Sequence, residues 1–192
     1  MKAAEEEPEF TFVPLPQGYS IDVGRKPRPR LEQFRTMSCV NGVIKFVAMV
    51  GFYENNFASD NLILRSWTLS SDLKEWKECN SMAVQDLWES KSFCERNLPK
   101  IPPMFPVLSI DEDEVVYLSL KEIERKIAVD IYGQFEGVEI VTKAHHVLCV
   151  DVIQNKVLHC TKYTQGTLIT SHWTTLLATE FTAYLHDHEV NR

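Results

Sequence analysis

The chain has 192 residues, of which 44% are hydrophobic and 24% are charged, and its formal net charge is −7. This apolar content is typical of a globular protein with a packed core. The negative charge disfavours nucleic-acid binding by the domain as a whole, because contact with phosphates requires a basic face.

The N-terminal residues 1–30 differ from the rest of the chain. They combine charge, proline and glycine in "EEEPEF", "VPLPQG" and "GRKPRPR". Proline restricts its own φ and the preceding residue, so we expect an extended tail with room for one short edge strand. The basic side chains Arg25, Lys26, Arg28 and Arg30 are typical either of a nuclear-import or docking signal or of a solvated linker.

A β-rich domain is predicted over residues 31–192, with short strands from Phe34 onward. Asn41-Gly42 separates two apolar runs and predicts a hairpin, because both residues tolerate a positive φ. Further strands are expected at 62–69 and 76–79, around a turn at 70–74. Trp67 and Trp76 then lie on one sheet face, where such rings either pack or form a ligand platform, and we expect packing.

A single helix is predicted over residues 84–98, ending before Pro99. Its apolar residues Val84, Leu87, Trp88 and Phe93 lie roughly on one face, as in a helix packed against a core. A proline-rich connection follows it.

A second set of strands is expected after this connection. Alternating apolar residues predict strands at 106–110, 115–120, 126–132 and 138–143, followed by a last hairpin of 145–152 and 156–163. The acidic residues 111–114 are interpreted as a solvated turn; a calcium site or a contact for a basic partner is the alternative, but the spaced ligands of a calcium loop are missing.

The C-terminal residues 171–188 predict an amphipathic helix with Ser171 as its N-cap. Its apolar face includes Trp173, Leu177, Phe181 and Tyr184, which are the candidate partner-binding residues. We expect this helix to cover outer sheet edges, because unpaired edges attract other strands.

The fold class predicted from these elements is mainly β with two or three helices. Two sets of four strands at a spacing of ~40 residues are typical of propeller blades, and a closed propeller needs ~4–8 of them. The pattern of strands therefore predicts about two blade-like units, a further hairpin and a C-terminal capping helix. Three arrangements stay open: an incomplete propeller, an open sandwich or half-barrel, and a ring completed by another chain.

These elements resemble, in their order and spacing, the plant proteins with domain of unknown function 1618, a family expanded in grasses. The resemblance covers about residues 35 to 135 and rests on "SCVNG", the Trp67/Trp76 pair, "DLW", the run from Leu98 to Pro106 and the acidic turn before "VVY". It implies a β-rich, propeller-like body, a plant source, no known catalytic activity, and links to stress response and gamete fertility. Family proteins usually have a longer N-terminal portion, so the chain resembles a truncated member.

Histidines and cysteines gather late in the sequence. If Gln154-Asn155 is a two-residue turn, Cys149 lies opposite Cys160, and Cys149, His159 and Cys160 become candidate zinc ligands. The other interpretation is small core cysteines and rim histidines. No C-x-x-C, H-x-x-x-H, G-x-S-x-G or glycine-rich phosphate loop is present, so the sequence predicts no cofactor and no catalytic residue.

The cellular context is predicted from cysteines and from the N-terminus. The five cysteines are scattered and suggest no disulfide framework, which favours a reducing compartment. The glutamate-rich N-terminus does not resemble a signal or transit peptide, and no apolar run approaches ~18 residues. We therefore expect no membrane span and a cytoplasmic or nuclear location.

These patterns together predict a noncatalytic protein-interaction or regulatory module that binds a protein partner or forms a homo-oligomer. Two alternatives stay open. One, implied by the resemblance, is a component of a reproductive-barrier (toxin–antidote) system that binds another protein. The other is a small metal-dependent hydrolase that uses the late histidines and cysteines.

Overall fold

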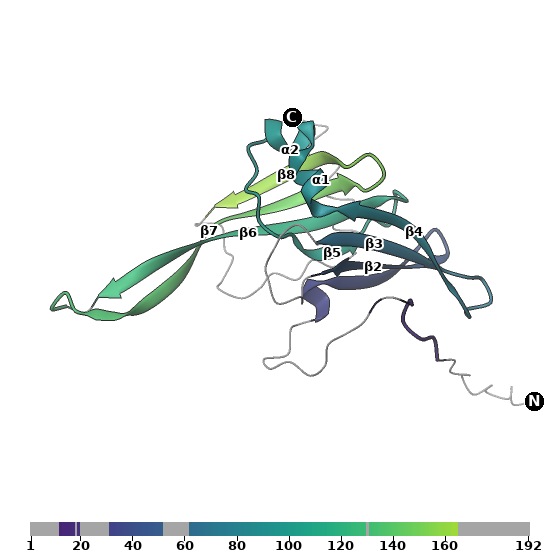
Figure 1. Cartoon of the computed structure of the whole chain (residues 1–192), viewed down its shortest axis with the longest axis horizontal. Coiled ribbons are helices and arrows are strands. Elements are labelled where there is room, and N and C mark those ends of the chain that lie inside the picture. The colour runs from purple at the N-terminus through teal and green to yellow at the C-terminus, as the bar shows by residue number, and fades with distance from the viewer. Residues whose placement is uncertain (1–11, 18, 20–30, 52–61, 130, 165–192) are drawn as a thin grey trace, which may run out of the picture.

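The computed structural model describes residues 12–17, 19, 31–51, 62–129 and 131–164. They form two four-stranded antiparallel sheets, in each of which every strand pairs with the next along the chain (Figure 1). The first sheet contains β1 (Arg35–Val40), β2 (Val43–Val50), β3 (Ile63–Leu69) and β4 (Trp76–Ala83), preceded by the 3₁₀ turn η1 (Leu31–Gln33). The helices α1 (Val84–Glu89) and α2 (Lys91–Glu95) connect it to β5 (Met104–Leu108), β6 (Val115–Val129), β7 (Phe135–Asp151) and β8 (Lys156–Thr164) of the second sheet.

The hairpin predicted at Asn41-Gly42 is confirmed. β1 and β2 pair up to Val40↔Val43, and Asn41 and Gly42 both have a positive φ, 52° and 78°. Two such residues make a type I′ turn, whose twist matches that of the flanking strands. The Asn-Gly dipeptide thereby sets the register of the first hairpin.

One hydrophobic core joins the two sheets. β5 lies against β1 and β2, so the sheets meet along their first strands. The core takes Val47, Met49, Leu64 and Met82 from the first sheet, Val84, Leu87, Trp88 and Phe93 from the helices, and Leu118, Leu120, Leu148 and Val150 from the second sheet. Because these side chains pack on one another, neither sheet buries its inner face without the other.

The prediction of one helix over residues 84–98 is wrong, although its apolar residues are buried as predicted. The chain forms two short helices that are separated at Ser90, whose φ of −62° and ψ of 143° are extended. The Ser90 hydroxyl accepts a hydrogen bond from the Phe93 amide at 3.3 Å, so this serine starts a new helix instead of continuing the first. Serine favours such capping positions because its side chain competes for backbone donors.

The outer face of the first sheet carries an aromatic cluster. Trp67 is only 2% exposed, and the Phe46 ring lies 5.6 Å from Trp67 and 5.9 Å from Trp76, so both tryptophans pack on one face. From the N-terminal segment, Tyr19 lies 5.3 Å from Phe46, and the Trp76 indole donates a 2.7 Å hydrogen bond to the Pro14 carbonyl. The described part of this segment therefore lies across the outer face of the first sheet.

The second sheet has fewer and longer strands than predicted. The strands predicted separately at 115–120 and 126–132 belong to one strand, β6, and those predicted at 138–143 and 145–152 belong to β7. The intervening residues 121–125 contain no glycine or proline, so nothing in the backbone breaks the strand. After the helix, the sequence predicts four strands and a further hairpin. The structure has instead a single four-stranded sheet in the order β5-β6-β7-β8.

The described residues are mainly β, with two antiparallel sheets and two short helices, and they form no closed propeller. Neither α1 nor α2 has the length or the apolar run needed to cross a bilayer, and they are the only α-helices in the described part. The predicted C-terminal helix, with Trp173, Leu177, Phe181 and Tyr184, lies outside the described residues.

Candidate functional site

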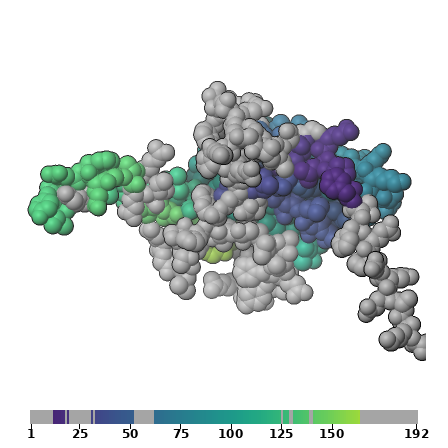
Figure 2. All heavy atoms as spheres, turned by 90° about the horizontal axis from the view of Figure 1, so that it is seen from below, coloured from purple at the N-terminus to yellow at the C-terminus, as the bar shows by residue number. Residues whose placement is uncertain are grey.

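A two-stranded ribbon extends from the second sheet. β5 pairs with β6 only as far as Ser119, and β8 pairs with β7 only as far as Ala144. β6 and β7 continue to pair with each other up to Val129↔Phe135. We call residues 121–144 the arm; it projects from the body in both views (green in Figures 1 and 2).

Alternation along the strands gives the arm two different faces. Ile123 and Ile127 lie four residues apart on β6 and share one face, and Val138 is directly opposite Ile127 on β7. Phe135 occupies the register position opposite Val129, two residues beyond Ile127. Side chains of opposed residues in an antiparallel pair point to the same side. We call Ile123, Ile127, Phe135 and Val138 the apolar row.

The apolar row is exposed. Ile127 and Phe135 are 71% and 70% exposed, and Ile123 and Val138 are 51% and 55% exposed. At the tip, between the two strands, Ile131 and Tyr132 are 91% and 81% exposed. Single apolar residues on a surface are ordinary, but a contiguous patch marks an interaction site. The arm is therefore the strongest candidate for a docking surface in the described part of the chain.

The apolar row continues the outer face of the second sheet. Tyr117, Ser119, Lys121 and Ile123 occupy alternate positions of β6, so they lie on the same side of the strand. Tyr117 packs in a buried cluster with Val107, Val115 and Cys149. Desolvation by burial raises the pKa of the Tyr117 hydroxyl, as expected of a ring inside a packed layer. The apolar row is therefore on the same side of the sheet as this cluster, and Ser119 and Lys121 separate the two along β6.

The opposite face of the arm is polar. Lys143 donates to Glu122 at 2.6 Å, at the point where the register of the two strands shifts. This hydrogen bond lowers the pKa of the Glu122 carboxyl and raises the pKa of Lys143. Glu124 and Lys126 follow Glu122 at alternate positions. Charged residues are thus more frequent on this face, and on the side of the apolar row the register position between Ile123 and Ile127 is Arg125.

A buried hydrogen bond anchors the root of the arm. The Ser119 hydroxyl and His145 Nε2 lie 2.6 Å apart, and the two residues are only 2% and 8% exposed. Burial lowers the pKa of His145, and nearby Lys121 lowers it further. A serine–histidine pair works as a nucleophile only where substrate reaches the hydroxyl. At this burial the pair is structural, since it satisfies two polar groups in the sheet.

The prediction that Cys149 lies opposite Cys160, on which the candidate zinc site depends, is wrong. β7 and β8 pair as Cys149↔His159 and Leu148↔Cys160, with a register shift between Cys149 and Val150. Cys149 therefore belongs to the outer cluster, and Cys160 packs against the main core on the other face. Burial raises the pKa of both thiols, to about 11 for Cys149. Across the described ranges, no three histidine, cysteine or acidic side chains are grouped to hold a metal ion.

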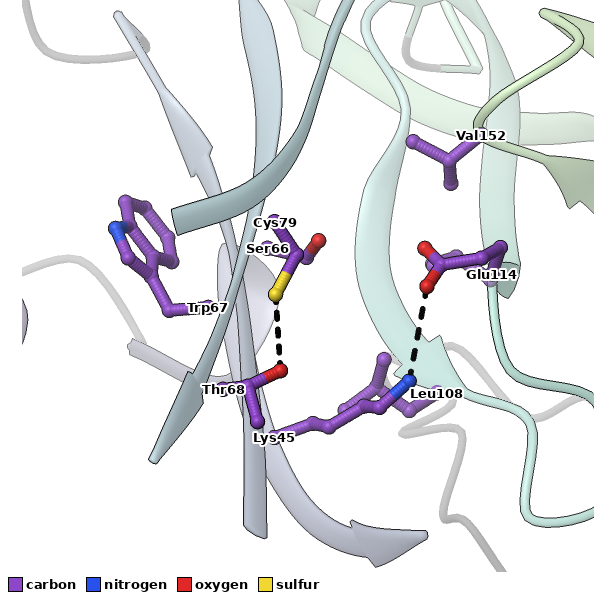
Figure 3. Close-up of a pocket in the computed structure, with 9 residues that line it drawn as sticks. Lys45, Ser66, Trp67, Thr68, Cys79, Leu108, Glu114 and Val152 are labelled. Atoms are coloured by element: carbon purple, nitrogen blue, oxygen red, sulfur yellow. Dashed lines mark hydrogen bonds and ion pairs between the residues drawn. The ribbon is translucent and has the colours of Figure 1, made fainter. Parts of the chain in front are cut away.

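A small cavity lies between the sheets (Figure 3), where the acidic turn meets the first sheet. Lys45 Nζ lies 3.2 Å from Asp113 and 3.8 Å from Glu114. The predicted solvated turn is thus only partly solvated, since the Glu114 side chain is 34% exposed and its carboxylate also accepts from Asn80. The cavity has a volume of about 10 Å³, which is enough for about one water molecule and too small for an organic substrate.

The sequence predicts partner-binding residues in the C-terminal segment and predicts no arm. The signal was present in the apolar residues Ile123, Ile127 and Val138 and in the absence of glycine or proline from 121 to 132. An uninterrupted strand of this length exceeds the usual 3–10 residues, so strand length by itself favours two shorter strands here.

A protein-family model matches the N-terminal part of the chain. The model described as "Protein of unknown function (DUF1618)" matches residues 1–117, which contain the first sheet, both helices, β5 and the first three residues of β6. The arm follows this region. No curated protein and no solved structure matches the chain.

Proposed function

The chain belongs to the DUF1618 family, and we propose that it is a noncatalytic protein-interaction module whose docking surface is the arm. The exposed apolar row on a projecting ribbon carries this proposal. It supports binding rather than chemistry, because the arm presents apolar side chains at its surface while the buried serine–histidine pair at its root is closed to substrate.

The arm offers two modes of binding at once. The backbone edge of β6 beyond Ser119 and the edge of β7 before Ala144 have no neighbouring strand among the described residues. An extended segment of another protein can add to such an edge through backbone hydrogen bonds, while alternate side chains set specificity. The apolar row supplies the second contact. The preferred partner is therefore a polypeptide with an exposed strand or helix that carries regularly spaced apolar residues.

The energy available in the row is enough for specific binding. Complete burial of an isoleucine, valine or phenylalanine contributes ~1.5–3 kcal/mol, and each residue of the row is at least half exposed. Each side chain therefore contributes about 1–2 kcal/mol when a partner covers it. Since 1.4 kcal/mol is tenfold in affinity, about one such contact changes the affinity tenfold.

The test is to place a charge in the row. Ile127→Asp puts a carboxylate at the centre of the apolar row, and Ala128→Asp puts the same carboxylate on the neighbouring residue, which faces the other side of the ribbon. Partners are captured from extract with the intact chain, identified by mass spectrometry, purified, and measured by calorimetry. We expect Ile127→Asp to weaken binding at least about tenfold and Ala128→Asp to leave it near the wild-type value.

A partner that binds both variants and the wild type equally well contradicts the arm as docking surface. Circular dichroism of each variant serves as the control for folding. The cytoplasmic or nuclear location, the role in a reproductive barrier and the hydrolase alternative stay predictions, and no geometry in the described residues favours the last two over binding.

A further inference from the structure

We propose that the outer face of the first sheet is a second binding site, which takes a proline-containing segment of a partner protein that also carries an acidic side chain. The described N-terminal residues 12–17 and 19, which we call the strap, occupy part of this site when no partner is bound. The site lies on the opposite side of the body from the arm (Figure 1). The inference therefore goes beyond the proposed function and depends on other observations.

Aromatic side chains of the first sheet hold the strap. The Trp76 indole donates a 2.7 Å hydrogen bond to the Pro14 carbonyl, and the Tyr19 ring lies edge-on against Phe46, with the ring centroids 5.3 Å apart. Between these two anchors Pro16 is buried, and Figure 2 shows the strap (purple) against the first sheet (blue). Aromatic surfaces recognise proline-rich segments in many binding domains, because proline fixes the backbone in advance and little entropy is lost on binding.

The strap fills this site only in part. It forms no strand, so no ladder of backbone hydrogen bonds ties it to the sheet. Phe12 and Leu15 are 88% and 42% exposed, and Trp76 is only half buried. A segment with few buried contacts opens locally at a low cost in free energy. A ligand that uses the same anchors and adds contacts can therefore take its place.

Two arginines lie beside the aromatic side chains on the same face. Arg35 in β1 and Arg65 in β3 are both directly opposite Ala48 in β2. Opposed residues of antiparallel strands point to the same side of the sheet, and Phe46, two residues from Ala48, shares this side. Because the side chain of Ala48 is a single methyl group, the two arginines are neighbours across it.

Both arginines have donors that the described residues leave unsatisfied. Arg35 Nη1 and Arg65 Nε are buried and have no hydrogen-bond partner there. The only printed ion pair of Arg65 is with Glu78, at 3.8 Å, which is longer than a hydrogen bond. A buried donor without a partner is costly, and a carboxylate is the acceptor that matches a guanidinium. The strap residues 12–17 and 19 include no acidic side chain, so the strap does not supply this acceptor.

The path of the strap sets the order of groups in a ligand. Pro14 lies at Trp76 in β4, and Tyr19 lies 5.8 Å from the Arg35 guanidinium in β1. The strap therefore crosses the sheet from its last strand to its first. A ligand with two prolines, an aromatic residue and then an acidic residue places its carboxylate near Arg35.

These contacts favour a partner protein over a second copy of the chain. A second copy offers an identical strap, which competes with a tethered segment at an effective concentration of about millimolar. A partner with an acidic residue gains charge-assisted hydrogen bonds that the strap lacks. The net charge of −7 repels acidic ligands in general, so binding of such a ligand depends on this local pair of arginines.

The experiment measures the binding of labelled synthetic peptides to the full chain by fluorescence anisotropy. The probe FVPLPQGYEE repeats residues 12–19 and adds two glutamates, and FVPLPQGYQQ carries glutamines in their place. We expect the glutamate peptide to bind about tenfold more tightly, because only its carboxylates accept charge-assisted hydrogen bonds. FVALAQGYEE, without prolines, should bind several-fold more weakly than FVPLPQGYEE. These comparisons use the wild-type protein, so the folding of variants does not affect them.

Variants of the full chain locate the bound peptide. Arg35→Gln should remove the preference for the glutamate peptide. Lys77→Gln is the matched control, because Lys77 is exposed and, as the neighbour of Trp76 in β4, faces the other side of the sheet. Tyr19→Ala loosens the strap and should tighten peptide binding several-fold, since less of the site is occupied in the free protein. Circular dichroism of each variant checks its folding.

Four outcomes overturn the inference. The first is equal affinity for the glutamate and glutamine peptides, and the second is an equal loss of affinity in Arg35→Gln and Lys77→Gln. The third is unchanged binding in Tyr19→Ala, which places the peptide elsewhere. The fourth is a wild-type dimer in sedimentation that Tyr19→Ala dissociates, which assigns the face to an exchange of straps between two copies. Ile127→Asp should bind the peptides as the wild type does, so a failure of the arm as docking surface leaves this result unchanged.

Discussion

Substitution of Leu148 by alanine tests whether the two sheets form one folding unit. Leu148 lies in β7 opposite Leu118, is 0% exposed, and belongs to the core to which the first sheet contributes Val47 and Leu64. If this shared core stabilises both sheets, a cavity in the second sheet destabilises the first by the same amount.

The magnitude follows from the burial of the side chain. Replacing a buried leucine by alanine costs about 2–5 kcal/mol, from lost transfer free energy and the remaining cavity. Since Leu148 is completely buried between two sheets, we expect about 3–4 kcal/mol in the free energy of unfolding. Each kcal/mol lowers the Tm of a chain of this size by about 2–4 °C. Ile153→Ala, in the β7–β8 turn where the side chain is 64% exposed, is the control and should change the stability by less than about 0.5 kcal/mol.

The assay is urea unfolding followed by two signals. In a Trp173→Phe background, tryptophan fluorescence reports the first sheet and α1 through Trp67, Trp76 and Trp88, while far-ultraviolet circular dichroism reports both sheets. We expect one transition that shifts equally in both signals, with an unchanged slope. A fluorescence midpoint that stays at the wild-type value while the circular dichroism signal changes refutes the shared core.

Three further predictions concern local contacts. Gly42→Ala should lower the free energy of unfolding in urea by about 1–2 kcal/mol, because the left-handed φ of 78° strains a residue with a Cβ. Nothing lies within 4 Å of that Cβ, so the cost comes from the backbone alone. An unchanged urea midpoint contradicts the turn. Burial lowers the pKa of His145 and His146 in the folded protein, so the unfolded chain binds more protons at the same pH. The contribution of these histidines to stability should therefore be constant above the unfolded pKa of about 6.5 and decrease as the pH falls below it. Urea midpoints from pH 8 to 5 measure this dependence, and a His146→Gln variant with the same pH dependence as the wild type argues against a role of that histidine. Trp76→Phe removes the hydrogen bond to the Pro14 carbonyl and should cost about 1 kcal/mol, whereas equal stability of variant and wild type by thermal unfolding argues against a bound N-terminal segment.

The arm lies beyond the part of the chain that the family model matches. The match ends at Tyr117, within the body of β6, and the arm begins four residues later. The matched region contains the first sheet, both helices and β5, while most of β6 and all of β7 and β8 lie beyond it. The apolar row is not part of the packed core of the body, so substitutions in the row should leave that core unchanged.

The sequence by itself determined the local features of this protein. The Asn41-Gly42 turn, the packing of Trp67 and Trp76 on one face and the buried side of residues 84–93 were all predictable, because short-range backbone preferences and alternation decide them. The mainly β fold class follows from the same signals. Each of these features depends on residues close together in the chain, which a pattern of apolar and polar letters records directly.

The tertiary structure alone decided where β6 and β7 end, which faces carry Cys149 and Cys160, and that Lys45 meets the acidic turn. Charged residues in the middle of β6 resemble a turn in the sequence, yet pairing with β7 keeps them in one strand. A single register shift moves a side chain to the other face of a sheet, and no local pattern shows where such a shift occurs. The apolar row became a candidate docking surface only when the structure showed that no described strand or helix covers it, because exposure depends on what lies opposite a residue in space.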